Sequence, residues 1–313
     1  MQARAVVLEE PRNVVVTTVE LEQPEPSDLV VDVAYSGIST GTERLLFTGE
    51  MPPFPGMGYP LVPGYESVGV VTEAGSSTGI AEGSTVFVPG AACFRNVRGL
   101  FGATASRLVV PARRAIPIDA ALGEDGILLA LAATAYHAIA AVGSRPPELI
   151  VGHGVLGRLL ARLTVAKWQV SPVVWEVDPG RSEGALGYEV IHPDNDGGRT
   201  YASIFEASGA GDQLDSLIGR LKPGGEIVLA GFYHQPLSFQ FPAAFMREAS
   251  LKIAAEFQPD DLVAVTGLVE SGLLPLEGLI THRTDASAAT SAYETAFTDT
   301  SCLKMVLDWR DRQ

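Results

Sequence analysis

The stretch LIVGHGVLGRLLARL at 149–163 decides the fold. It sets Gly152, Gly154 and Gly157 in the spacing G-x-G-x-x-G, between an apolar run typical of a strand and a run with helical periodicity. In such a turn Gly152 allows the tight bend, Gly154 lets the backbone approach a pyrophosphate, and Gly157 lets the helix pack closely on the strand. The motif predicts a dinucleotide site. The alternative is an ordinary turn whose glycines serve packing alone.

The expected cofactor is NAD. Its phosphates would bind at the N-terminus of the predicted helix, where the N–H groups of Val155 and Leu156 lack partners within the helix. The next predicted strand, VVWEVD, ends in acids, and Glu176 lies 19 residues after the last glycine, about where a ribose-binding acid belongs. Asp178 is the competing candidate. Two carboxylates repel a 2′-phosphate and therefore favour NAD over NADP. Arg181 is the one residue here that would favour NADP, because its positive charge attracts a phosphate.

The segments around this motif divide the chain into two regions. Residues 123–279 alternate strand-like and helical runs, which predicts a parallel, doubly wound sheet. Residues 1–122 carry Val-rich alternating runs between Gly and Pro, which predicts a β-rich domain. The Pro-rich run at 50–64 is expected to be an ordered loop without regular structure. The tail, 280–313, has a helix and a last strand that could rejoin the first region, so the sequence predicts a two-domain α/β protein.

Composition narrows the partners and the compartment. The 313 residues carry 22 basic and 37 acidic side chains, a net charge of −15, which argues against nonspecific binding to nucleic acid. The two cysteines, Cys93 and Cys302, stand in no metal motif and are typical of free thiols in a cytoplasmic protein. We expect no secretory signal and no membrane-spanning helix, with contact at a membrane surface still open.

Seven segments together resemble the medium-chain dehydrogenase/reductase family. The resemblance implies a GroES-like catalytic domain over 1–122, to which 280–313 returns, a Rossmann NAD-binding domain over 123–279, and a homodimer. It adds Thr134, Ser208 and Gly231 to the expected cofactor site. The segments are SGISTGTE at 36–43, PGYESVGVV at 63–71, GLFGATASRLVVP at 99–111, ATAYHAI at 133–139, FEASG at 205–209, LKPGGEIVLAGF at 221–232 and ITHR at 280–283.

The same resemblance shows that the catalytic zinc ligands of the family are replaced. The family's first cysteine falls at Ser39 or Thr40, its histidine at Tyr65 and its second cysteine at Ala130. Only the acid, Glu66, is kept. Hydroxyls and an alanine cannot form the nitrogen and sulfur site that zinc prefers, so a zinc-independent member is expected, with no metal site.

Within the family, the run SGISTGTERLLFTGEMPPFPGMGYPLVPGYE resembles members that oxidise the 3-(1-hydroxyethyl) group of (bacterio)chlorophyllide a to 3-acetyl in bacteriochlorophyll a synthesis. The resemblance makes this pigment the expected substrate. Its flat ring suits an apolar wall formed by Phe54, Met57 and Tyr59, although the same side chains could simply cover the core of the β-rich domain. Its propionate requires a cation, for which Arg95 is the candidate chosen, with Arg44 and Arg98 also near.

The candidate catalytic groups are hydroxyls. Thr42 follows Gly41 as the family's substrate-binding threonine follows its glycine, and Tyr65 stands where the metal would be. Tyr65 has an ordinary pKa of about 10, so it could act as a base only beside a cation; otherwise its ring fills the space left by zinc. Glu66 could orient it or serve structure alone. His137, on an Ala-rich helix, is a further proton-relay candidate but more often a packing residue.

Two other functions stay open at this stage. A zinc-free quinone or enone reductase that uses NADPH would have the same scaffold, and the acids Glu176 and Asp178 argue against it. A non-catalytic nucleotide-binding protein would also have this scaffold, and the complete glycine motif with a placed acid argues against that.

Overall fold

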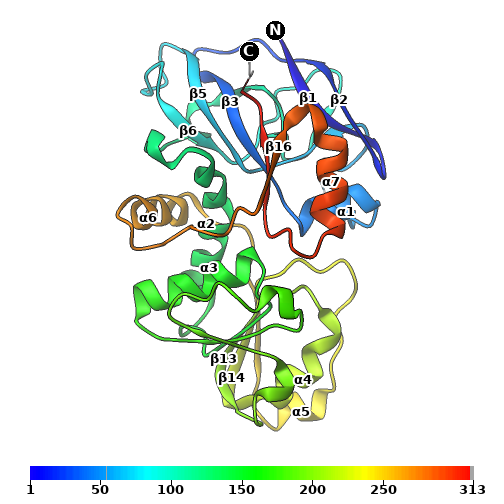
Figure 1. Ribbon diagram of the computed structural model, residues 1–313, viewed down its shortest axis with the longest axis vertical. Helices are drawn as coiled ribbons and strands as arrows, with labels where there is room; N and C mark the ends of the chain where they lie inside the picture. The colour runs from blue at the N-terminus through cyan, green and yellow to red at the C-terminus, as the bar shows by residue number, and fades with distance from the viewer. Residues whose placement is uncertain (54, 311–313) are drawn as a thin grey trace. The chain divides into compact units, whose positions relative to one another are not determined.

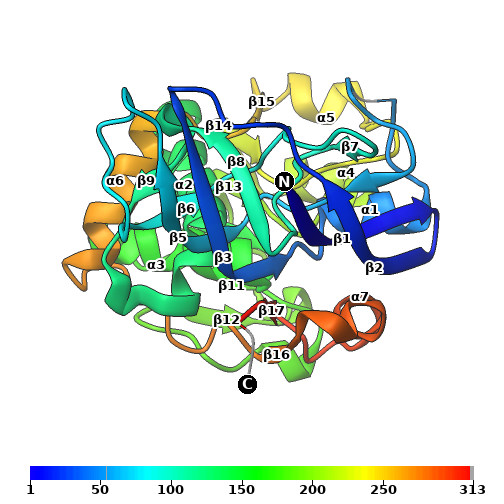
Figure 2. The same ribbon diagram turned by 90° about the horizontal axis from the view of Figure 1, so that it is seen from above.

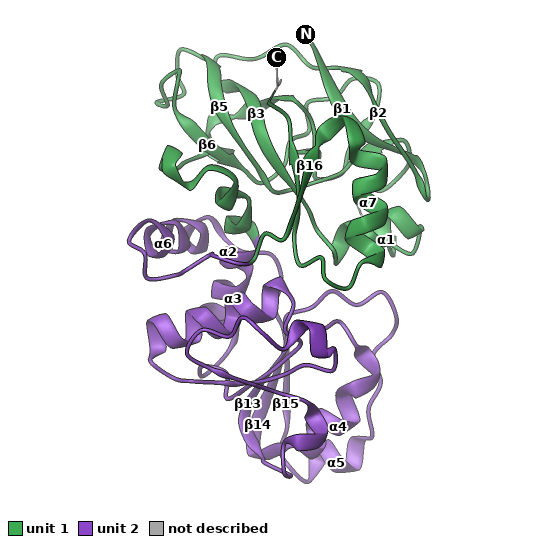
Figure 3. Cartoon of the chain, viewed as in Figure 1, with its two compact units in different colours: residues 1–130, 279–313 green, residues 131–278 purple. Residues whose placement is uncertain are grey.

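The computed structural model describes residues 1–53 and 55–310. The chain forms two compact units, which Figure 3 distinguishes by colour: Met1–Ala130 with Leu279–Gln313, and Leu131–Gly278. The sequence had placed the boundaries after residue 122 and before residue 280. Residues 123–130 belong instead to the first unit, because they pack on its strands: a Cβ on Gly126 would lie 2.8 Å from Val68, and one on Gly37 would lie 2.9 Å from Ile127.

The first unit is built from two sheets. One has the order β2-β1-β4-β7, and the other β16-β17-β3-β5-β6-β9, with β8 also paired to β3. The strands are β1 (Gln2–Glu10), β2 (Asn13–Glu20), β3 (Asp28–Ile38), β4 (Leu61–Val62), β5 (Ser67–Ala74), β6 (Thr85–Val88), β7 (Arg98–Gly99), β8 (Arg107–Pro111), β9 (Ile116–Pro117), β16 (His282–Asp285) and β17 (Met305–Asp308). The helices are α1 (Thr42–Thr48) and α7 (Ala289–Thr298).

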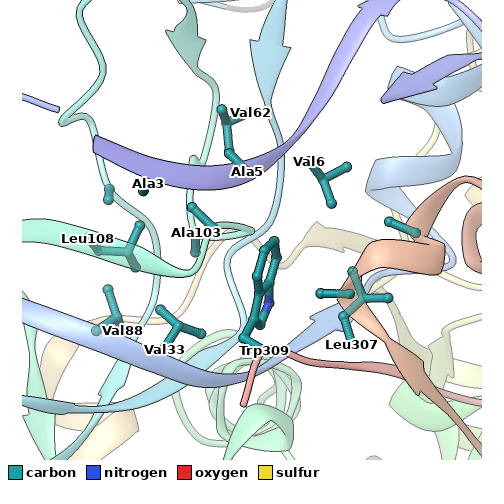
Figure 4. Close-up of a cluster of buried hydrophobic side chains, with 14 of the residues drawn as sticks. Ala3, Ala5, Val6, Val33, Val62, Val88, Ala103, Leu108, Leu307 and Trp309 are labelled. Atoms are coloured by element: carbon teal, nitrogen blue, oxygen red, sulfur yellow. The ribbon is translucent and has the colours of Figure 1, made fainter. Parts of the chain in front are cut away.

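The core of this unit follows from the alternation of its strands, since β-branched side chains on one face of each strand pack inward. Figure 4 shows Val6, Val33 and Leu307 around the ring of Trp309. The Trp309 indole N–H donates to Ser36 Oγ at 2.8 Å, which satisfies the one polar group of the ring. The expectation of no regular structure over 50–64 is wrong for β4, because Leu61 pairs with Leu8 of β1.

The C-terminal segment completes the first unit. β17 is antiparallel to β3, with Met305 opposite Ile38 and Asp308 opposite Tyr35. Figures 1 and 2 both show β16 and β3, from opposite ends of the chain, within one layer of strands. The return of the tail to the first region therefore supplies strands to its central sheet.

The second unit is a parallel sheet of six strands in the order β12-β11-β10-β13-β14-β15. In chain order this is 3-2-1-4-5-6, the doubly wound order of dinucleotide-binding domains, so the predicted Rossmann sheet is confirmed. Its strands are β10 (Leu149–Val151), β11 (Val173–Trp175), β12 (Glu189–Ile191), β13 (Tyr201–Glu206), β14 (Leu221–Leu229) and β15 (Ser250–Ile253). Its helices are α3 (Val155–Leu163), α4 (Leu214–Gly219), α5 (Phe241–Phe245) and α6 (Pro259–Glu270), and α2 (Leu129–His137) enters it from the first unit.

One helical stretch, Ala120–Val142, is long and apolar enough to cross a membrane by length and composition. More than half of it is buried inside the protein, as in core helices that pass the same test. Its backbone also leaves helical geometry at Gly123, with φ of 50° and ψ of −127°. Elsewhere in the described chain no helix meets the criterion.

Candidate active site

The glycine loop between β10 and α3 has the geometry that a dinucleotide needs. Gly152 has a φ of 97°, which favours glycine, and a Cβ on Gly157 would lie 1.8 Å from the Gly152 carbonyl oxygen. A Cβ on Gly154 would meet nothing within 4 Å, so open space lies beside this residue. The N–H groups of Val155 and Leu156, at the first helical positions, point out of the helix toward such a ligand. The residues present therefore fit a pyrophosphate.

Glu176 is fixed against this loop. Its Oε2 accepts the His153 N–H at 2.9 Å, and its Oε1 accepts those of Val177 and Asp178 at 2.8 Å each. Glu176 as a whole residue is 9% exposed, and a carboxylate oxygen can accept more than one hydrogen bond, so it can also accept from a ribose hydroxyl. Asp178 instead accepts the Gly180 N–H at 2.9 Å, and its other oxygen lies 3.9 Å from Arg181 Nε. Of the two predicted acids, Glu176 is the one that touches the glycine loop.

The loop is held from behind by residues that the motif alone did not identify. His153 is fully buried, with Nδ1 at 2.6 Å from the Arg181 carbonyl and Nε2 at 2.9 Å from the Tyr188 hydroxyl. Burial lowers its pKa to about 4, so the ring is neutral at neutral pH. Arg158, also buried, donates to the carbonyls of His153 and Arg181 at 3.0 Å each. His153, which occupies the position between the first two glycines of the motif, thus anchors the 179–188 loop through Arg181 and Tyr188.

The other predicted cofactor residues lie in the same unit. Gly152 is packed against Ser208, since a Cβ on this glycine would lie 3.0 Å from Ser208 Cβ. Ser208 and Gly231 are joined by the buried carboxyl group of Glu206, which accepts the Ser208 N–H at 2.8 Å and lies 3.4 Å from where a Gly231 Cβ would stand. Thr134 is half-buried on α2. Sequence reasoning missed Glu206 as a residue of this site, although it is the acid of the FEASG segment that the family resemblance had already singled out.

In the first unit, three hydroxyl groups meet where the family holds its metal. Ser39 Oγ and Tyr65 OH are 2.5 Å apart, and the Thr42 side chain also hydrogen-bonds to Tyr65. Ser39 follows β3 directly, Thr42 begins α1, and Tyr65 precedes β5, so three separate elements fix the cluster. The Tyr65 ring packs edge-on against Phe101, with centroids 5.1 Å apart. Thr40, the alternative for the first position, is exposed.

A buried ion pair lies beside this cluster. Lys304, the residue before β17, donates to the two oxygens of Glu66 at 2.9 and 2.7 Å. Both side chains are almost wholly buried. The Lys304 Nζ also lies 3.4 Å from the Ile38 carbonyl oxygen. Glu66 is thereby neutralised by a residue that no motif pointed to. Gly37 is required here, since a Cβ on it would lie 2.3 Å from Glu66 Oε2.

A second buried carboxyl group, Glu43, also adjoins the cluster. Its Oε1 accepts the Ser39 N–H at 3.0 Å, and its Oε2 accepts the hydroxyl of Tyr293 from α7 at 2.6 Å. Burial raises the pKa of Glu43 to about 7, against the lowering effect of these hydrogen bonds. Sequence reasoning missed Glu43, although it is the acid of the SGISTGTE segment.

The surroundings of Tyr65 oppose a phenolate. Burial raises the pKa of Tyr65 well above its usual range, and the nearby carboxylate of Glu66 raises it further. The hydrogen bonds from Ser39 and Thr42 lower it by less. At neutral pH Tyr65 therefore keeps its proton, and its hydroxyl acts as a hydrogen-bond donor or as a link in a relay.

The residues present do not fit zinc. The oxygens of Ser39 and Tyr65 bond each other, Glu66 is paired with Lys304, and Ala130 offers no donor atom. Over residues 1–53 and 55–310, no group of three or more His, Cys, Asp or Glu side chains is placed to hold a metal ion. Neutral hydroxyl oxygens do not provide the nitrogen and sulfur set that zinc prefers.

The remaining predicted residues take other positions. His137 Nδ1 lies 2.7 Å from Asp261 Oδ2 of α6, so this histidine fastens α2 to α6 within the second unit. Met57 and Tyr59 pack against the core of the first unit, and the Tyr59 hydroxyl donates to the Leu46 carbonyl oxygen. Arg95 Nε bonds Glu22 Oε2 at 3.0 Å, so its guanidinium already has a carboxylate partner at the surface. Phe54 lies outside the described residues.

Comparison with known proteins identifies the family. Residues 25–120 match the family model of the alcohol dehydrogenase GroES-like domain. Two relatives named 2-desacetyl-2-hydroxyethyl bacteriochlorophyllide A dehydrogenase align over 99% of this chain and of their own. The relative from Cereibacter sphaeroides is 58% identical and that from Rhodobacter capsulatus 56%. The chain belongs to the medium-chain dehydrogenase/reductase family.

Solved structures agree with this membership at the level of the fold. A protein titled a short chain alcohol dehydrogenase, from Escherichia coli and solved with NADH, has a TM-score of 0.83 at 21% identity; the match covers 98% of this chain and 99% of that one. The 2R,3R-butanediol dehydrogenase of Bacillus subtilis has a TM-score of 0.83 at 18% identity, over 98% and 99% of the chains. The expected GroES-like and Rossmann architecture of a medium-chain dehydrogenase/reductase is thus confirmed.

Proposed function

We propose that this enzyme oxidises the 3-(1-hydroxyethyl) group of (bacterio)chlorophyllide a to 3-acetyl, with NAD as oxidant and without catalytic zinc. The observation that carries the proposal is the full-length identity of 58% and 56% to two dehydrogenases of a hydroxyethyl bacteriochlorophyllide. The hydroxyl cluster and the glycine loop supply the two sites that such a reaction needs.

Residues of the second unit would hold the cofactor. The pyrophosphate binds the N–H groups that open α3, and the ribose hydroxyls bind Glu176, whose negative charge disfavours a 2′-phosphate. When bound, NAD accepts the hydride that leaves the carbinol carbon. This specificity speaks against the alternative of an NADPH-dependent quinone or enone reductase.

Residues of the first unit would hold the alcohol. Ser39, Thr42 and Tyr65 present hydroxyls that both donate and accept, so they can fix the substrate hydroxyl and pass its proton along a hydrogen-bonded chain. Glu43, whose pKa is about 7, adjoins this chain through the Ser39 backbone and is the group beside it that can change charge near neutral pH. Since the carbinol carbon is attached to a conjugated ring, charge that develops there is delocalised, which reduces the need for a metal.

Two further features belong to the proposal. We infer a homodimer that forms through β15, the edge strand of the parallel sheet, because apolar side chains stand exposed near it: Phe241, Phe245, Met246 and Ile253 are 65–77% exposed. We also infer a cytoplasmic protein that touches a membrane surface at most, in keeping with two buried cysteines, Cys93 and Cys302, that form no disulfide.

The test is an absorption time course of the purified protein with NAD and the 3-hydroxyethyl pigment, in the presence of a chelator. Oxidation brings a carbonyl into conjugation with the ring, so the long-wavelength band should move to the red while NADH forms. A shift that appears only after zinc is added would overturn the metal-free chemistry. No shift under either condition would overturn the pigment substrate. Replacement of NAD by NADP should slow the reaction strongly.

A further inference from the structure

An open cavity of about 500 Å³ lies in the first unit. The residues that line it include three with apolar side chains, Met57, Phe94 and Val97, and one cation, Arg98. A thioether, a benzene ring and a branched aliphatic side chain around one hollow suit the rim of a large, flat, apolar ligand.

Arg98 is held at this cavity by its backbone and its side chain. It begins β7, where it pairs with Leu61 of β4, and its Nη1 donates to the Met57 carbonyl oxygen at 3.1 Å. The guanidinium lies across Gly58, since a Cβ on that glycine would be 1.3 Å from Nη1. A side chain at position 58 would displace it.

The guanidinium of Arg98 is available to an anion. In the described part of the chain it forms no ion pair, although the protein has 37 acidic residues, and one of its five N–H groups is used by Met57. Its neighbour Arg95, in contrast, is paired with Glu22 at 3.0 Å. A planar fork of free N–H groups at the rim of an apolar hollow is matched to a carboxylate carried by an apolar body.

The cavity is joined to the hydroxyl cluster through one short segment, 99–102. The Phe94 ring packs against Gly99 and Gly102, with ring carbons 3.1 Å from where their Cβ atoms would stand. Between these glycines, Phe101 places its ring edge-on against Tyr65. A rigid ligand whose hydroxyl reaches Tyr65 would thus extend along an aromatic strip toward Arg98.

We propose that Arg98 binds the propionate of the tetrapyrrole substrate, while Met57, Phe94 and Val97 contact the adjoining ring. This rests on the proposed function, since it assigns a specificity-determining residue to the same substrate. It replaces Arg95 in that role, because Arg95 is already paired with Glu22. It also gives Met57 two tasks, in the core of the domain and in the wall of the cavity.

The experiment compares the free-acid pigment with its propionate methyl ester on four proteins: the wild type, Arg98→Gln, Arg98→Lys and Arg95→Gln. Arg98→Gln should raise KM for the acid about tenfold or more, with kcat and the KM for the ester almost unchanged. Arg98→Lys should keep part of the preference for the acid, since lysine keeps the charge but not the planar fork. Arg95→Gln is the matched surface control and should change neither substrate.

The ester separates a lost carboxylate contact from a disturbed 56–60 loop, because a disturbed loop would affect both pigments equally. Equal effects of Arg98→Gln on acid and ester, or a wild type that does not distinguish them, would overturn the assignment. If the wild type oxidises neither pigment, the proposed function fails. Titration of pigment fluorescence by the same proteins still tests the carboxylate site, with acid bound more tightly than ester only while Arg98 is present.

Discussion

At the scale of single residues, the proposed alcohol site is a cluster of hydroxyl groups at positions where the family resemblance places metal ligands. Tyr65 takes the place of a histidine ligand, and its hydroxyl bonds Ser39 at 2.5 Å instead of a metal. The replaced ligands could be read from the sequence, because each lies in a motif with fixed spacing. Lys304 and Tyr293 could not, because they reach the site through the tertiary fold: Lys304 lies 238 residues from Glu66 and Tyr293 lies 250 residues from Glu43. Glu43, four residues after Ser39, was within reach of sequence reasoning as the acid of the SGISTGTE segment.

Tyr65→Phe should lower kcat about a hundredfold or more, with little change in KM, because the variant removes one hydroxyl from the chain that carries the proton. Steady-state oxidation of the pigment measures this. Tyr59→Phe is the matched control, since that tyrosine also lies in the first unit and its hydroxyl bonds a backbone carbonyl. Near-normal turnover of Tyr65→Phe would mean that the ring only fills space.

Glu43 should make the stability of the protein depend on pH. Its pKa rises from 4.5 to about 7 on folding, so the folded state binds the proton more tightly than the unfolded state. The stabilisation is then fully present below about pH 4.5 and is lost as the pH rises through 7, up to about 3 kcal/mol in total.

Glu43→Gln should therefore gain stability relative to the wild type between pH 5.5 and pH 8, as denaturant unfolding at the two pH values would measure. The exposed Glu82→Gln is the control and should leave the difference between the two pH values unchanged. A Glu43→Gln protein with the same dependence on pH as the wild type would contradict this assignment.

At the scale of elements, the turn from β10 to α3 is the part that the sequence predicts best. The structure shows the steric reason at Gly152, with a φ of 97°, and at Gly157, whose Cβ would meet the Gly152 carbonyl oxygen, while Gly154 has open space beside it. The ends of the elements were less predictable. The α-helix α3 ends at Leu163 and continues as a π-helical turn over Thr164–Trp168, and β11 spans only three residues. Hydrogen-bond partners set such ends, and these partners belong to neighbouring segments.

Two glycine variants should separate folding from cofactor binding. Gly157→Ala puts a Cβ 1.8 Å from the Gly152 carbonyl oxygen, so it should lower the melting temperature and weaken NADH binding. Gly154→Ala meets no atom within 4 Å, so it should leave the melting temperature unchanged and still weaken NADH binding, because the Cβ takes the place of the pyrophosphate.

Thermal unfolding and a NADH fluorescence titration measure the two effects. Gly267→Ala on α6, which also meets no atom within 4 Å, is the control and should bind NADH normally. Normal NADH binding by Gly154→Ala would mean that this glycine is not beside the cofactor.

At the scale of the whole molecule, the first unit is made from two distant parts of the chain. The return of the tail was predicted from the family pattern, but its purpose was not. The tail places β17 against the central strand β3 and delivers Lys304 to Glu66. A single sequence shows neither contact, since both depend on the register of β17.

Lys304→Met should cost about 3–5 kcal/mol of unfolding free energy, because it leaves the Glu66 carboxylate buried without a partner. The double variant Glu66→Gln with Lys304→Met should recover much of that loss, since no charge then remains buried. Denaturant unfolding of the two single variants and the double variant measures the coupling. Additive losses would show that the two residues do not stabilise one another.

The discontinuity of the first unit also governs the order in which the protein matures on the ribosome. Residues 131–278 are synthesised as one block and can fold while the chain is still growing. The earlier block, although it is made first, lacks Lys304 and β17 until translation has passed residue 308. The N-terminal part of this unit must therefore wait with Glu66 uncompensated, and its buried ion pair forms only after residues 131–278 have been made.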